Sequence, residues 1–137
     1  MIRKYYAKFY ARYNIAIYVI KERPISVLNK FNQYASRLCV SSITSAELYF
    51  GAENSKHVAQ NLAQVDDFLS RLVVLDYDLH ASTHYGNIYA NLKQKGKVLS
   101  ENDMHIAGHA RSQGLILVTN NTSEFERVEG LRLDNWI

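Results

Sequence analysis

The chain has 137 residues, of which 47% are hydrophobic and 21% are charged, a composition typical of one soluble globular domain with a core of its own. A single cysteine, Cys39, excludes an internal disulfide, and its place in the apolar run LCVSS predicts a buried side chain rather than a nucleophile. No apolar run is long enough for a signal peptide or a membrane helix, so we expect a cytoplasmic protein with no membrane contact. The net charge of +3 mildly favours a polyanionic partner such as nucleic acid.

Hydrophobic patterns predict strands that alternate with helices along the chain. In chain order they indicate a strand at about 9–12, helices over 14–21 and 25–36, a strand over 38–42, helices over 43–52 and 56–71, a strand over 72–77, helices over 78–95 and 101–112, and a strand over 115–119. Gly96 and Gly114 stand where two of these helices should end.

The last three strands are short, apolar and rich in β-branched residues, which is typical of buried parallel strands. One proline and no repeat or low-complexity stretch leave no linker that would divide the chain. We therefore predict one α/β domain over residues 1–137, with a mostly parallel β-sheet flanked by helices. In such a sheet, functional groups gather at the carboxyl ends of the strands.

Glu47 is the first candidate for a functional acid. On a helical wheel it falls inside a stripe formed by Ile43, Ala46 and Phe50, whereas a solvated glutamate should lie opposite such a stripe. The alternative is an edge glutamate that reaches solvent or pairs with an arginine.

Asp103 repeats the arrangement, because Ile106, Ala107 and Ala110 share its helix face. Ser100 and Asp103 also resemble a capping box, with Ser100 as the N-cap residue and Asp103 as the acid of the first turn. The capping role does not exclude a second role at a metal ion.

Two acids on inward helix faces indicate a cation site, since a buried carboxylate must be paired or bind a cation. Phosphodiester hydrolysis has a use for such a site, because a hard divalent ion stabilises charge on the phosphate oxygens and lowers the pKa of an attacking water. Thr119, Asn120 and Asn121 follow the last predicted strand and are either a turn or polar ligands at the sheet rim. His105 and His109 have the spacing of a zinc helix but lack its glutamate, and they point away from the Asp103 face.

Three motifs carry a family resemblance: SSITSAELYFGA, NDMHIAGHA and LVTNN, followed by a closing Trp136. From Asn14 onward the chain resembles a PIN-domain ribonuclease of the VapC type. The resemblance implies a Mg²⁺-dependent endoribonuclease, with Mn²⁺ as a possible substitute, that is the toxin of a toxin–antitoxin pair. It further implies cleavage of initiator tRNA in the anticodon loop, a VapB-type antitoxin as partner, and a homodimer.

By the same resemblance, Glu47 and Asp103 are the second and third catalytic acids and the metal ligands. Asn121 falls at the position of the fourth acid, and Asn14 and Thr119 would support the cluster through hydrogen bonds. The first acid of the family is an aspartate, and here its position holds Arg12.

Arg12 is the serious departure from the family, because it places a positive charge beside the expected cation. If one T is inserted after the first codon of TTT ATG CTA GAT ACA AAC, which encodes the family-typical F-M-L-D-T-N, and one A is later lost, the product is F-Y-A-R-Y-N, the sequence of residues 9–14. We interpret residues 10–13 as the result of a compensated frameshift. Arg12 should then occupy the place of the metal, with its guanidinium on Glu47 or Asp103.

Three hypotheses follow. The chain is a toxin endoribonuclease, either with aspartate at position 12 in the true gene or with weak residual activity. Alternatively it is a catalytically inactivated PIN module that only binds its antitoxin, for which the helices over 14–36 and 43–71 offer apolar surface. The third is a PIN relative with a structural or DNA-repair role.

Overall fold

A five-stranded sheet forms the centre of the computed structural model, which describes residues 7–136. The strand order is β3-β2-β1-β4-β5, and all four neighbouring pairs are parallel. The strands are β1 (Phe9–Ala11), β2 (Leu38–Ser41), β3 (Val73–Leu75), β4 (Ile116–Val118) and β5 (Arg132–Asp134). The predicted α/β class with a mostly parallel sheet is confirmed.

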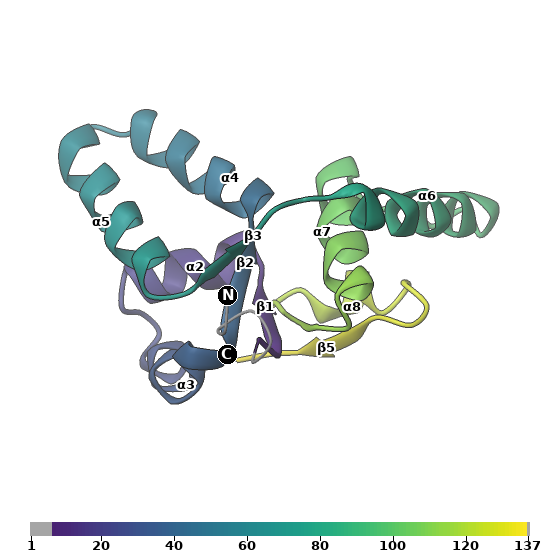
Figure 1. Ribbon diagram of the computed structural model, residues 1–137, viewed down its shortest axis with the longest axis horizontal. Helices are drawn as coiled ribbons and strands as arrows, with labels where there is room; N and C mark the ends of the chain where they lie inside the picture. The colour runs from purple at the N-terminus through teal and green to yellow at the C-terminus, as the bar shows by residue number, and fades with distance from the viewer. Residues whose placement is uncertain (1–6, 137) are drawn as a thin grey trace.

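The helices cover both faces of this sheet. They are α2 (Tyr13–Ile20), α3 (Ile25–Tyr34) with the short 3₁₀ turn η1 (Ala35–Arg37), α4 (Ser42–Glu53), α5 (Val58–Ser70), α6 (Leu79–Gln94), α7 (Glu101–Ser112) and α8 (Thr122–Phe125). Figure 1 shows α4 and α5 as one arm of the molecule and α6 and α7 as another, with the sheet between them. Among the described residues, none of these helices is long and apolar enough to cross a membrane.

Two hydrophobic cores lie on opposite faces of the sheet, and the alternation of side chains along each strand feeds both. In β1, Phe9 and Ala11 pack into the core beneath α2 to α5, whereas Tyr10 packs into the core beneath α6, α7 and α8. Cys39 joins the second core and is fully buried, as predicted, and burial raises the pKa of its thiol to about 12. The thiol therefore stays protonated and structural.

Two features differ from the sequence-based expectation. The strand that contains Val74 was expected to be buried, but β3 is an edge strand and leaves 38% of Val74 exposed. The prediction also stopped at residue 119 and omitted α8 and β5. These elements are only four and three residues long, and so short a segment carries no readable period.

A glycine sets the distance between the two helices of the α6–α7 arm. A Cβ atom at Gly108 of α7 would lie 2.8 Å from the backbone nitrogen of Tyr85 and 3.3 Å from the carbonyl oxygen of Ala81, both in α6. Backbone atoms of a packed helix cannot move aside as the end of a long side chain can. Only a hydrogen at this position allows α7 to approach α6 so closely, and α7 is the helix that carries Asp103.

We expect Gly108→Ala to lower the free energy of unfolding by about 1–3 kcal/mol, because the added methyl group forces the two helices apart. Gly86→Ala is the matched control, since a Cβ atom added at Gly86 of α6 would meet no other atom within 4 Å. The control should be neutral or stabilising by up to about 1 kcal/mol, through helix propensity alone. Urea denaturation followed by circular dichroism measures both, and equal stability of the two variants would contradict the close-packing argument.

Candidate active site

Arg12 is held at the carboxyl edge of the sheet by its backbone. Its amide donates to the carbonyl of Val118, 3.0 Å away, which extends the pairing of β1 and β4 by one residue. Its own carbonyl accepts hydrogen bonds from Ile15 and Ala16, at 3.0 and 3.2 Å, and so begins α2. The side chain takes no part in capping α2 and is free to extend across the sheet edge.

Asp103 reaches the same edge from the first turn of α7. The Ser100 hydroxyl accepts a hydrogen bond from the Asp103 amide at 3.2 Å, so the predicted N-cap is confirmed. The residues predicted to share its face, Ile106, Ala107 and Ala110, are all buried, and Asp103 itself is only 6% exposed.

Arg12 and Asp103 form an ion pair across this edge. Arg12 Nε and Nη2 donate to the same carboxylate oxygen, Asp103 Oδ1, at 3.1 and 2.9 Å. The guanidinium also lies over the ring of Phe125 in α8, 5.7 Å from its centroid. The expectation that Arg12 turns onto the acids is confirmed, and the acid that accepts its hydrogen bonds is Asp103.

Glu47 completes the cluster from α4, although the predicted stripe around it is wrong. Thr44, Leu48 and Ala52 are the buried residues of α4, whereas Phe50 is 69% exposed. The helix turns this other face inward because it packs on α5 and α2. Glu47 therefore lies half-buried at the edge of the contact face, directed toward α7.

The two oxygens of Glu47 have different surroundings. Oε2 accepts a hydrogen bond from Asn102 Nδ2 at 3.2 Å, whereas Oε1 is buried without a hydrogen-bond partner. Burial raises the pKa of Glu47, the Asn102 hydrogen bond and Arg12 lower it, and Asp103 raises it further. Arg12, Glu47 and Asp103 thus interact electrostatically, although they lie far apart in the sequence.

Two contributors were missed by the sequence analysis, Asn102 and Phe125. The motif NDMHIAGHA contains Asn102, but the sequence analysis gave this residue no role. Phe125 lies in the helix that was not predicted. No sequence signal indicated that its ring would lie beneath Arg12, the residue that follows β1.

The other predicted residues lie at the same rim but contact one another rather than the acids. Asn14 Nδ2 donates to Asn120 Oδ1, and Asn120 Nδ2 donates to the Tyr18 hydroxyl at 3.2 Å. Thr119 is fully buried, and its hydroxyl accepts a hydrogen bond from the Asn121 amide at 3.0 Å. These bonds shape the turn between β4 and α8, and Asn14 links α2 to it.

Two histidines of α7 have protein partners nearby. His105 Nδ1 lies 2.6 Å from the Tyr77 hydroxyl, and its ring stacks on Tyr85 with centroids 3.9 Å apart. His109 is fully buried, and its Nδ1 lies 3.1 Å from the hydroxyl of Tyr10. Burial lowers the pKa of His109, which keeps its ring neutral.

The residues present do not fit a divalent cation. Across residues 7–136, no group of three or more histidine, cysteine, aspartate or glutamate side chains is placed to hold a metal ion. Glu47 Oε1 is without a partner, but Asp103 Oδ1 already accepts two N–H groups from a cation of this chain. A Mg²⁺ ion bound here would have to displace or repel the Arg12 guanidinium.

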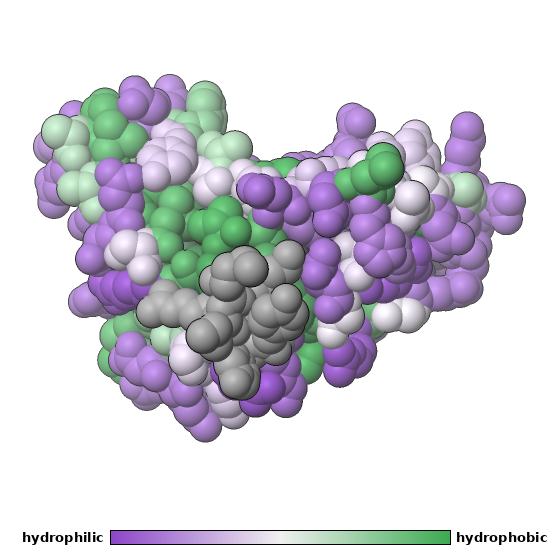
Figure 2. Space-filling model, in the orientation of Figure 1, coloured by the Kyte–Doolittle hydropathy of each residue, from purple (hydrophilic) through white to green (hydrophobic). Residues whose placement is uncertain are grey.

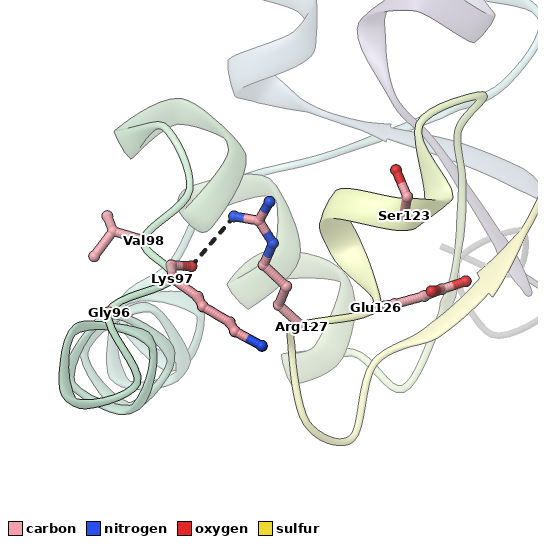
Figure 3. A pocket seen from close by; sticks show the side chains of 6 residues that line it. All are labelled: Gly96, Lys97, Val98, Ser123, Glu126 and Arg127. Carbon is pink, nitrogen blue, oxygen red and sulfur yellow. Dashed lines mark hydrogen bonds between the residues drawn. The ribbon is translucent and has the colours of Figure 1, made fainter.

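A separate hollow of about 590 Å³ lies beside α8. Figure 3 shows its lining, with Arg127 donating a 3.5 Å hydrogen bond to the carbonyl of Lys97. The hollow contains neither of the candidate acids. It is lined by Gly96, Lys97, Val98, Ser123, Glu126 and Arg127.

Comparison with known proteins shows which family the chain belongs to. The PIN domain model matches residues 14–131 and begins two residues after Arg12. Ribonuclease VapC2 of Haemophilus influenzae is 59% identical over 90% of this chain and 94% of its own length. The tRNA(fMet)-specific endonuclease VapC of Shigella flexneri is 51% identical over 94% of this chain and 98% of its own length.

Among solved structures, the DNA-bound VapBC complex of Salmonella typhimurium contains a chain that superposes with a TM-score of 0.91. It is 48% identical and covers 96% of this chain and 99% of its own. The chain belongs to the PIN-domain family and, within it, to the VapC ribonucleases, the toxins of VapBC toxin–antitoxin systems.

The raised pKa of Glu47 leads to a pH-dependent prediction. A carboxyl whose pKa is higher in the folded state binds its proton more tightly there than in the unfolded state. Its ionisation therefore destabilises the fold once the pH rises above the pKa that the carboxyl has in the unfolded state. Glu47→Gln should therefore be more stable than the parent chain at pH 7, and the difference should vanish below about pH 4. Thermal unfolding from pH 4 to 8 measures this, and a stability difference that is the same at every pH would contradict it.

Proposed function

We propose that this chain is a VapC toxin of the kind that cuts initiator tRNA in the anticodon loop, and that Arg12 suppresses its nuclease activity. The proposal takes its substrate from relatives that are named tRNA(fMet)-specific endonucleases at 49% and 51% identity. The observation that carries it is the meeting of Glu47, Asp103 and Arg12 at the carboxyl edge of the sheet. We place the protein in the cytoplasm as a homodimer, with residues 1–137 as one domain.

We place the cluster at the base of a saddle, the surface between the two arms of the molecule, because its two acids come from different arms. Figure 2 shows the surface hollowed between the arm of α4 and α5 and the arm of α6 and α7. Glu47 belongs to the first arm and Asp103 to the second, so a strand of RNA laid across the saddle would meet both acids. Glu47 is the acid not bonded to Arg12, and its raised pKa would suit it to take a proton from an attacking water once a metal site is restored.

Aspartate at position 12 would change what this site binds. Three carboxylates would then converge where two carboxylates and a guanidinium now meet. Such a set of oxygen ligands suits Mg²⁺, or Mn²⁺, which would stabilise charge on the scissile phosphate. Asn121, with Asn14 and Thr119 behind it, would line the rim of that site.

Arg12→Asp should therefore create or strongly increase Mg²⁺-dependent cleavage of purified initiator tRNA, by about 100-fold or more if one essential ligand is restored. Arg71→Asp is the matched control, since Arg71 also pairs with an aspartate, Asp67, but on the exposed surface of α5. Both variants change the charge by the same amount. Equal cleavage by the parent, the variant and the control would refute a role for position 12.

A second candidate function is a binding module that retains its antitoxin without cutting RNA. The specific observation in its favour is the Arg12–Asp103 ion pair, which lies in the centre and not at the partner surface. If Arg12 is the natural residue, antitoxin binding is the activity that this chain keeps. Cleavage by the unaltered chain distinguishes the two candidates.

A groove of about 270 Å³ between α2, α4 and α5 supports an antitoxin partner. Its walls include Ile17, Leu48 and Val65, apolar side chains that suit the apolar face of a peptide. Figure 2 shows hydrophobic side chains gathered on the molecular face where α2 lies below the α4–α5 arm. The solved VapBC complexes that this chain resembles are assemblies of toxin and antitoxin.

Ile17→Asp should weaken antitoxin binding by about 2 kcal/mol or more, because it places a charge in an apolar groove that the partner desolvates. Ile25→Asp serves as the control, since Ile25 is 66% exposed and lies outside the groove. Isothermal titration with a VapB-type antitoxin measures both. An unchanged affinity in Ile17→Asp would place the antitoxin on another surface.

A further inference from the structure

Arg12 supplies the same change in charge that a divalent cation would. Replacing an aspartate by an arginine raises the charge of the cluster by two units, which is the charge of Mg²⁺. With Glu47 and Asp103 ionised, the centre carries one net negative charge. Three carboxylates around one divalent ion carry the same charge, so this centre is electrostatically complete without a metal.

The geometry of the guanidinium adds a binding capacity. Nε and Nη2 are both committed to Asp103 Oδ1, and the Phe125 ring lies against the group at 5.7 Å. These contacts fix the plane of the guanidinium. Nη1 has no partner within residues 7–136, and 24% of the side chain is exposed to solvent. An oriented guanidinium with open N–H donors is a favoured partner for a phosphate oxygen.

We propose that Arg12 replaces the metal ion of this centre and makes it a metal-independent RNA-binding site, in which Nη1 donates to a backbone phosphate that is not cleaved. The inference rests on the proposed function in one respect, that RNA is the ligand of the saddle. The chain then binds RNA equally well with and without divalent cations.

The chemistry of the guanidinium explains why binding would not lead to cleavage. It donates hydrogen bonds and stabilises phosphate charge, but it has no acceptor site and cannot take a water molecule as a ligand. The nucleophile of phosphodiester hydrolysis would therefore not be activated beside it. Binding and hydrolysis, which one metal ion serves together, are separated in this chain.

The test is RNA binding in EDTA and in MgCl₂ at constant ionic strength, by fluorescence anisotropy of a short labelled single-stranded oligoribonucleotide with the anticodon-loop sequence. A short single strand avoids the effect of Mg²⁺ on RNA folding. The parent chain should bind with the same Kd in both buffers, within about twofold. Arg12→Asp should bind about tenfold more weakly in EDTA and recover in MgCl₂.

Arg12→Gln keeps the test decisive if Arg12→Asp does not fold without metal, because it removes the guanidinium without adding an acid. It should also lose about tenfold in EDTA, whereas the surface control Arg71→Asp should lose much less. Melting curves give an independent readout. Several millimolar Mg²⁺ should raise the Tm of Arg12→Asp and leave that of the parent unchanged.

Three results would overturn the inference: a parent chain that binds RNA only with Mg²⁺, a parent chain that cleaves the bound strand, or an Arg12→Gln variant that binds as the parent does in EDTA. A different result would refute the proposed function instead. In that case neither the parent chain nor Arg12→Asp in MgCl₂ would bind the oligoribonucleotide at all.

Discussion

The ion pair between Arg12 and Asp103 is the interaction on which the character of this centre depends. Asp103 is only 6% exposed, and a carboxylate so placed must be paired or neutralised. Loss of one partner from a fully buried pair costs about 3–5 kcal/mol. Arg12 is a quarter exposed, and solvent screening puts its contribution below that range. Even so, without Arg12 this acidic edge would attract a cation, whereas with Arg12 it already contains a cationic side chain.

The fold brings this pair together through backbone structure that owes nothing to the charges. Parallel pairing of β1 and β4 places Arg12 at the carboxyl edge, where its amide bonds to Val118. The Ser100 cap begins α7 so that Asp103 lies in its first turn, and Gly108 lets that helix approach α6 closely. An aspartate at position 12 would be delivered to the same place. The scaffold is therefore that of the PIN-domain family, and it brings the side chain of position 12 against Asp103.

The centre and the apolar groove are neighbours, because Tyr13, which follows Arg12, and Leu48, which follows Glu47, both line the groove. The groove is walled by α2, α4 and α5, whereas the ion pair joins the end of β1 to α7. A change at position 12 alters the ion pair, whereas the apolar side chains that line the groove stay the same. The proposed cleavage of RNA and the proposed binding of an antitoxin would rest on different side chains of these neighbouring sites.

The sequence by itself determined the alternation of strands and helices, the N-cap at Ser100, the burial of Cys39 and the inward position of Asp103, because these depend on local periods and local hydrogen bonds. It also determined the family, since the motifs lie within short segments. Only the tertiary structure decided which face of α4 turns inward, because α5 and α2 select it, and a wheel drawn for α4 alone cannot include them. The tertiary structure likewise decided that Arg12 pairs with Asp103 over Phe125, and that Asn102 orients Glu47. Those contacts join residues from separate elements, and their geometry exists only after the sheet has formed.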